Sequence, residues 1–124
     1  MLYGGVGYFY VFDEEFCNNL KQNIESQEFK IDLIKEFEVI EGNNGIILIG
    51  MDIDNDAPSG NIIKVEEIEY HHTISGPNEI ETAKNLSDPV LQKLFDKHGI
   101  NDDLGALEFG KYSYCYLSTI SNLK

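Results

Sequence analysis

A sharp reversal in the middle of the chain constrains the fold more than any other segment. Residues 41–45 read Glu-Gly-Asn-Asn-Gly, and glycine and asparagine tolerate the positive φ angles that tight turns require. Before this segment Phe37 and Val39 alternate with acidic residues, and after it residues 46–53 are mostly apolar. Alternation with a period of two is typical of a β-strand, so the sequence predicts a β-hairpin here.

Patterns typical of strands also occur on both sides of this hairpin. Residues 8–12 are aromatic or β-branched, and Phe29, Ile31 and Leu33 alternate with polar residues. Residues 107–117 form a further alternating segment near the end of the chain. We expect a strand at each of these places.

Residues 62–74 resume an extended pattern in which the apolar phase changes once. The apolar positions pass from odd-numbered to even-numbered residues between Val65 and Ile68. A β-bulge inserts one extra residue into a strand and would produce this slip of register. We therefore expect a bulge near Glu66 or Glu67.

Two regions carry the signals of helices. Asp13 can accept hydrogen bonds from a first turn, and apolar residues then recur every four positions until about Ser26. A later helix is predicted to begin at Ser87-Asp88-Pro89, where a capping side chain precedes a proline, and to end at residues 97–99, Lys-His-Gly. Residues 77–86 are interpreted as a short, separate helix before it.

The order of these segments predicts the fold class. One strand, a helix, several strands, further helices and a last strand indicate an α+β architecture. The length of 124 residues is near the commonest domain size. We expect a single α+β domain over residues 1–124, with two to three helices packed on one face of a mostly antiparallel sheet. The other face is expected to be open and lined by tyrosines and carboxylates.

The charge of the chain limits its partners. It has 22 Asp and Glu residues against nine basic residues, all of them lysine, and a net charge of −13. Nucleic-acid surfaces need clustered basic residues, and arginine above all grips phosphates, so we expect no nucleic-acid partner. The charge would accelerate the encounter with a basic protein. Alternatively, it serves only to keep the protein soluble.

Membranes and disulfides are not predicted either. No stretch reaches the roughly 18 to 20 apolar residues of a membrane span, and residues 1–12 lack the basic start of a secretory signal. The expected compartment is cytoplasmic. Cys17 and Cys115 lie in apolar patterns and are interpreted as free, buried thiols.

One acidic segment gives an alternative function. Asp52, Asp54 and Asp56 are alternate carboxylates at a strand end, which could converge on Ca²⁺ or Mg²⁺. The segment resembles the opening of an EF-hand loop, but Ala57 replaces the glycine at the sixth position and Ile63 the glutamate at the twelfth. A small divalent-metal-dependent hydrolase or metal-binding module is therefore the alternative to a solvated acidic turn.

Other catalytic patterns do not assemble in the sequence. His71 and His72 are neighbours on a strand, so they point to opposite faces and at most one can join a site. Residues 4–7, Gly-Gly-Val-Gly, lead into a strand, whereas phosphate-binding loops open a helix. Ser113, Ser118 and Cys115 lie beside apolar residues and have no histidine nearby in the sequence. We predict that the protein is not an enzyme and uses no cofactor.

Tyrosines form the best candidate binding surface. In residues 107–117 three tyrosines alternate and should share one face of the strand. Tyrosine is enriched in binding hot spots, and carboxylates beside it would pair with a basic partner. Half-buried structural packing is the alternative interpretation. The candidate partner-binding residues are Tyr70, Tyr112, Tyr114, Tyr116, Glu66, Glu67 and Glu69.

In size, acidity and aromatic-plus-acidic surface, the chain resembles the small acidic immunity proteins with which bacteria neutralise their own toxins, many of which are basic nucleases. The resemblance includes no sequence motif, so it assigns no residue roles. It implies an inhibitor that binds a cognate toxin domain stoichiometrically. A related alternative is a DNA-mimic inhibitor, whose carboxylates imitate phosphates and block a phage-defence nuclease.

Overall fold

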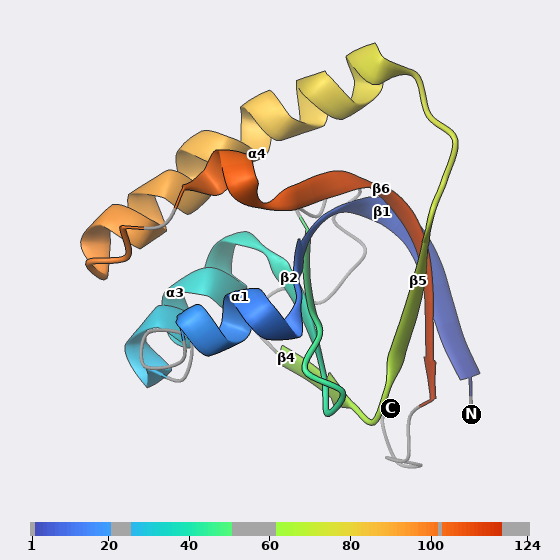
Figure 1. Ribbon diagram of the computed structural model, residues 1–124, viewed down its shortest axis with the longest axis horizontal. Helices are drawn as coiled ribbons and strands as arrows, with labels where there is room; N and C mark the ends of the chain where they lie inside the picture. Colours follow the sequence, from blue (N-terminus) through green and yellow to red (C-terminus); the bar gives the residue numbers. More distant parts are fainter. Residues whose placement is uncertain (1, 21–25, 51–61, 102, 118–124) are drawn as a thin grey trace.

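Six strands form one curved sheet in the computed structural model (Figure 1). The structure describes residues 2–20, 26–50, 62–101 and 103–117. Along the order β4-β2-β3-β1-β6-β5, every neighbouring pair is antiparallel except β2 with β4. The predicted α+β fold with a mostly antiparallel sheet is therefore confirmed. The strands are β1 (Leu2–Phe12), β2 (Glu38–Gly42), β3 (Ile47–Gly50), β4 (Ile62–Val65), β5 (Ile68–His72) and β6 (Glu108–Leu117).

The α-helices formed by the described residues pack on one face of this sheet, as the sequence predicted. They are α1 (Glu14–Asn19), α3 (Gln27–Glu36) and α4 (Pro77–Lys97), and a short 3₁₀ helix, η1 (Leu104–Ala106), precedes β6. None of the helices in the described ranges combines the length and the apolar character that crossing a bilayer requires.

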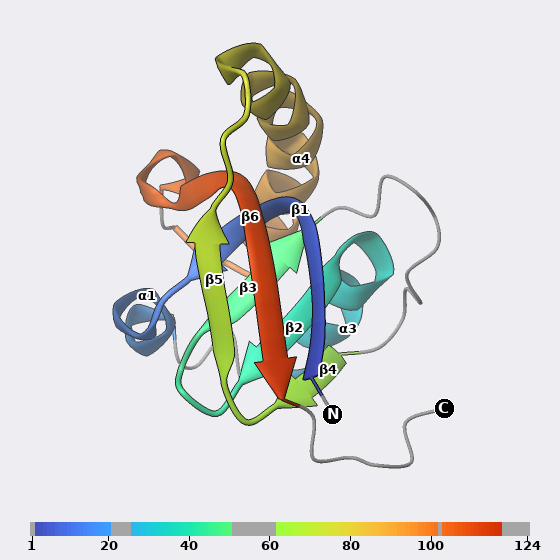
Figure 2. The same cartoon turned by 90° about the vertical axis from the view of Figure 1, so that its right-hand side faces the viewer.

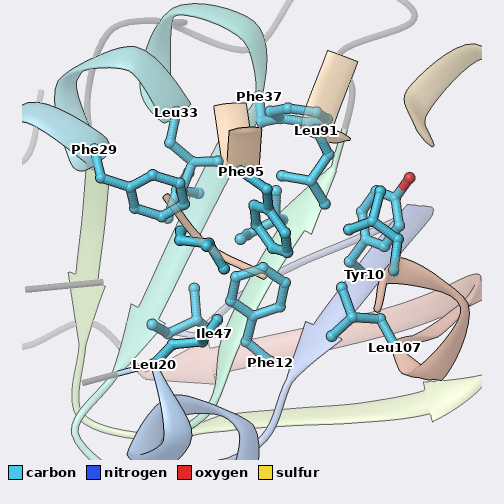
Figure 3. Close-up of a cluster of buried hydrophobic side chains, with 14 residues drawn as sticks. Tyr10, Phe12, Leu20, Phe29, Leu33, Phe37, Ile47, Leu91, Phe95 and Leu107 are labelled. Atoms are coloured by element: carbon cyan, nitrogen blue, oxygen red, sulfur yellow. The ribbon is translucent and has the colours of Figure 1, made fainter. Parts of the chain in front are cut away.

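A large aromatic core lies between the helices and the sheet (Figure 3). The rings of Phe29 on α3 and Phe95 on α4 lie 6.2 Å apart between centroids, and Tyr10 on β1 lies 6.5 Å from Phe37. These four side chains are almost completely buried. Burying a side chain of this size stabilises a fold by roughly 1.5 to 3 kcal/mol, so this core fixes the helices on the sheet.

The opposite face of the sheet is also largely buried, so the expectation of an open face is wrong. Figure 1 shows β1 and β6 bending strongly, and the sheet wraps around this face. A second core fills the concave side, with Phe9, Ile40, Leu48 and Ile68 among its buried residues. Strong twist and curvature let a sheet bury both of its faces, one against helices and one against itself.

The curvature follows from the way the two edge strands are connected. β4 and β5 lie at opposite edges of the sheet, yet only Glu66 and Glu67 separate them in the chain. The predicted bulge is therefore wrong, because the slip of register marks a corner between two strands. The hairpin turn closes this corner: the Asn43 amide donates to the Val65 carbonyl at 3.0 Å, and the Asn44 side-chain amide donates to the Ile68 carbonyl at 3.4 Å.

The predicted hairpin is confirmed within the described residues, where β3 covers Ile47–Gly50 of the strand predicted over residues 46–53, and residues 51–53 lie outside them. β2 and β3 pair with Val39 opposite Ile49, and Gly45 has a φ of +85° in the turn between them. This angle lies in the left-handed region that glycine adopts without steric cost.

The segment that precedes the hairpin is helical, so the strand predicted from Phe29, Ile31 and Leu33 is wrong. In α3, Phe29 and Leu33 are one helical turn apart and both are buried, whereas Ile31 is 42% exposed. Three apolar residues at alternate positions fit a helix equally well when the middle one faces solvent.

The two helices predicted over residues 77–99 are one continuous helix. α4 begins at Pro77 and contains Pro89 in its interior, so the helix start predicted at Ser87-Asp88-Pro89 is wrong. The Ser87 hydroxyl donates to the Ala83 carbonyl at 2.8 Å, and Asp88 accepts a hydrogen bond from the buried Tyr10 hydroxyl. These side chains therefore make contacts inside a helix and do not cap one.

The other helix ends agree in part with the sequence. Asp13 caps α1 by accepting from the Phe16 amide at 2.7 Å, as predicted. However, α1 ends at Asn19, earlier than expected, and residues 21–25 lie outside the described residues. At the end of α4, Gly99 has a φ of +69° and the Ile100 amide donates to the Phe95 carbonyl at 2.8 Å, which confirms the predicted glycine cap.

Candidate functional site

The concave side of the sheet brings all four predicted tyrosines together. In the pairing of β5 with β6, Tyr70 lies opposite Tyr114, and the ring centroids of Tyr70 and Tyr112 are 5.5 Å apart. Tyr114 and Tyr116 stack with nearly parallel rings, whose centroids are 6.2 Å apart. The expectation that Tyr112, Tyr114 and Tyr116 share one face is confirmed.

These tyrosines differ in exposure. Tyr112 is only 1% exposed and belongs to the second core, whereas Tyr70, Tyr114 and Tyr116 are partly buried at its margin. Burial, followed by the charge of Glu38, raises the pKa of Tyr114 to about 12. The rings of Tyr70, Tyr114 and Tyr116 are therefore partly accessible from solvent, whereas Tyr112 packs beneath them in the second core.

Glycines in the neighbouring strands make room for the rings. A Cβ atom on Gly5 would lie 2.8 Å from the Tyr114 hydroxyl oxygen, and one on Gly50 would lie 2.6 Å from the Phe9 ring. Both distances are shorter than carbon atoms tolerate without displacement. The glycines of residues 4–7, which were expected to precede a strand, lie within β1 itself, and at Gly5 the missing side chain permits aromatic packing.

A polar group that the sequence analysis missed lies at one end of the tyrosine cluster. The Tyr112 hydroxyl oxygen is 2.9 Å from His72 Nε2, and this nitrogen is 3.8 Å from Glu108 Oε1. Burial, then the charge of Glu108, raises the pKa of Tyr112, so its hydroxyl keeps its proton at neutral pH. Glu108, like the three tyrosines, occupies an even-numbered position of β6, so alternation along the strand could have placed it on the same face from the sequence alone.

Two carboxylates act on the neighbouring Tyr70. Burial, then the charges of Glu108 and Asp13, raises the pKa of the Tyr70 hydroxyl. The two carboxylates come from the start of β6 and from the N-cap of α1, which are far apart in sequence. The fold thus concentrates acidic groups along the edge strand β5.

The three predicted glutamates lie at this same edge. Glu66 and Glu67 are exposed at the corner between β4 and β5, and neither forms an ion pair with any residue in the described ranges. Glu69 is also exposed but points to the convex side, where its carboxylate is 3.9 Å from the Cys115 thiol. Within the described residues, Glu66 and Glu67 therefore present carboxylates without a counter-charge.

The two histidines separate as predicted. His72 faces Tyr112 on the concave side, whereas His71 pairs with Ser113 in the ladder and belongs to the other face.

Metal binding is not supported within the described residues. Asp52, Asp54 and Asp56 lie outside them. In the part of the chain that the structure describes, no three His, Cys, Asp or Glu side chains are placed to hold one ion.

Cys17 and Cys115 are free and partly buried. Burial, then the charges of Asp13 and Glu41, raises the pKa of the Cys17 thiol to about 11. That thiol is not a ready nucleophile at neutral pH.

A further ion-pair group connects two helices on the opposite side of the molecule. The Asp32 carboxylate on α3 lies 2.8 Å from Lys97 Nζ and 2.8 Å from His98 Nε2 at the end of α4. Hydrogen bonds from Lys97 and then His98 lower the pKa of Asp32. This group stabilises the packing of α3 on α4 and is separate from the acidic edge.

The candidate functional site is the exposed margin of the edge strand, which we call the β5 surface and define by Glu66, Glu67, Tyr70, His72 and Glu108. It combines a partly buried aromatic ring, an exposed imidazole and three carboxylates. Such a surface can bind cationic groups and supply aromatic contact.

Comparisons with protein-family models, with curated proteins and with solved structures found no match.

Proposed function

We propose that this protein is an acidic inhibitor of the immunity-protein type, which binds a basic protein toxin in the cytoplasm and neutralises it by stoichiometric complex formation. The observation that supports this proposal most directly is the β5 surface. There Glu66 and Glu67 make no ion pair with a described residue and lie on the same edge as Tyr70. The protein would act without chemistry of its own and without a cofactor.

The charge of the chain sets the kinetics of such binding. A net charge of −13 produces a long-range field that attracts a basic partner before contact. Exposed ion pairs contribute only about 0 to 1 kcal/mol each to the binding free energy. The carboxylates of the β5 surface would therefore act mainly on the association rate. Affinity would come from the tyrosine rings, which bury large area at low entropic cost.

A nuclease is the class of toxin that fits this charge best. An enzyme that cleaves a polyanion needs a basic cleft, and carboxylates on an inhibitor compete for that cleft. A DNA-mimic inhibitor of a defence nuclease would use the same surface against a different target.

The first experiment is capture of the partner with a matched pair of variants. The wild-type protein, the variant E66K/E67K and the control E28K/E36K are immobilised and exposed at low salt to lysate of the native host. Glu28 and Glu36 are exposed on α3, so both variants change the net charge by the same amount. We expect the wild type and the control to retain one basic domain at near-equal stoichiometry, and E66K/E67K to lose it.

The captured domain, once purified, is then tested for steered association. We expect the association rate constant to fall by at least about tenfold between 50 and 500 mM salt, because screening shortens the range of the field. A rate constant that does not change with salt would refute electrostatic steering. Equal loss of the partner by both variants would refute the assignment to the β5 surface.

Thermal unfolding with divalent ions separates this proposal from the alternative of a metal module. A specific site stabilises the folded state by mass action. If millimolar Ca²⁺, Mg²⁺ or Mn²⁺ raised the melting temperature of the wild type and not of D54A, the metal module would replace the inhibitor as the favoured function. We expect no such difference.

A further inference from the structure

We propose that β5 accepts an extended, lysine- or arginine-bearing segment of the basic partner as an additional strand of the sheet. This inference rests on the proposed function and specifies how the partner binds. Strand addition supplies affinity through main-chain hydrogen bonds and specificity through alternate side chains.

One side of β5 has free hydrogen-bonding groups. The strand pairs with β6 on one side, and within the described residues it has no strand on its other side, as Figure 2 shows. The Thr73 amide donates to the Lys111 carbonyl at 2.8 Å, so Thr73 points its main-chain groups towards β6. Because these directions alternate, the N–H and C=O groups of Tyr70 and His72 point away from β6, and they make no backbone hydrogen bond to another described residue.

The free part of the edge has a defined beginning and continues past the strand. At the first residue of β5, the Ile68 carbonyl already accepts a hydrogen bond from the Asn44 side chain, so pairing with an added strand can start only at Tyr70. Two residues after His72, the side chain of Ile74 is 100% exposed. An apolar side chain beside an open edge gains burial when a strand is added there.

The side chains around this edge select a basic strand. On the concave side an added strand would lie near Glu108, whose carboxylate is 3.8 Å from His72 Nε2, and on the convex side near Glu69, so cationic side chains could be accommodated on both of its faces. A second copy of this chain would place two molecules of charge −13 against each other. Charge therefore favours a strand from a basic partner over self-association.

Among the described residues, proline, lysine and a bulge, three of the features with which proteins commonly block such pairing, are absent from this edge. Edge strands are often protected by proline, by lysine, by a bulge or by a covering segment. The strand β5, Ile-Glu-Tyr-His-His, contains neither proline nor lysine and is paired without interruption to β6. Its neighbouring carboxylates discourage pairing between identical copies and leave it available to a cationic strand.

The test uses a defined probe and the full-length chain. A nine-residue peptide of alternating lysine and valine, blocked at both ends, is titrated into ¹⁵N-labelled protein. The control peptide has the same sequence with every backbone nitrogen methylated, so it keeps its charge but loses its strand donors. With the first peptide we expect shifts at the amides of Tyr70 and His72 and at least fivefold slower hydrogen exchange there, and with the control no change at these amides.

Two variants of His72 distinguish the contribution of the main-chain N–H to peptide binding from that of the side chain. Both H72A and H72P lose the contact with Tyr112, but only H72P removes the outward N–H, and an edge strand tolerates proline at such a position. We expect H72P to bind the peptide at least tenfold more weakly than H72A. Equal affinity of the two variants, equal effects of both peptides, or no shift at Tyr70 and His72 at millimolar peptide would overturn the inference. The inhibitor proposal fails separately, when capture yields no basic protein although the peptide pairs with the edge.

Discussion

Replacing Pro89 with alanine tests whether α4 is one continuous helix. Pro89 is exposed in the helix interior, where it has no N–H to donate to the carbonyl of Asn85 and its ring crowds that carbonyl. Alanine restores the donor and removes the crowding. A proline in a helix interior is less favourable than alanine by about 3 kcal/mol. Relaxation of the native helix around the ring recovers part of this cost, so we expect P89A to stabilise the protein by about 1 to 3 kcal/mol.

A helix that started at Pro89 would respond with the opposite sign. At the first helical position the missing N–H costs nothing, and the fixed φ of proline lowers the entropy of the unfolded chain. Alanine would then destabilise the protein by about 0.4 to 1 kcal/mol. Pro77 occupies such a first position in α4, so P77A serves as the control and is expected to lose stability.

Thermal and urea unfolding measure both variants. For a domain of this length, the expected gain corresponds to a rise in melting temperature of about 4 to 12 °C. The dependence of the unfolding free energy on urea should stay unchanged, because both proteins bury the same surface. A P89A variant that is no more stable than the wild type would refute the argument that Pro89 is strained inside a helix.

Two further predictions concern packing and pH. The G5A variant should lose about 1 to 3 kcal/mol of stability, because its Cβ atom would lie 2.8 Å from the Tyr114 hydroxyl, and urea unfolding should show a smaller loss when Tyr114 is already alanine. Because the folded-state pKa of Asp32 is lowered by Lys97 and His98, its contribution to stability is present above about pH 4 and is lost as the pH falls through the folded pKa. The melting temperature of D32N should therefore decrease less steeply between pH 5 and pH 2 than that of the wild type, and parallel curves would contradict this role for Asp32.

Local signals in the sequence were sufficient for several elements. The hairpin turn ending at Gly45, the cap at Asp13 and the glycine cap at Gly99 each depend on the conformational preferences of a few adjacent residues. The alternating tyrosines of β6 also identify one strand face without further information. These features are predictable because their causes lie within about one turn or one strand of sequence.

Patterns that fit two periods were decided by tertiary contacts. Phe29, Ile31 and Leu33 match a strand, and α3 satisfies the same residues by exposing Ile31 and burying the other two against the aromatic core. In α4, the hydrogen bond from Tyr10 fixes Asp88 within the helix, although the local sequence favours a helix start there. Each ambiguity was resolved by a partner that is distant in the chain.

The candidate site illustrates the same division. Composition alone determined that the chain is acidic and rich in tyrosine, and periodicity placed Tyr112, Tyr114 and Tyr116 on one face. Only the tertiary structure decided that Tyr112 is buried, that Glu108 and Asp13 lie near Tyr70, and that β5 is an edge strand. The physical reason is that charge and alternation are properties of neighbouring residues, whereas burial and strand order depend on which distant segments pair when the sheet curls.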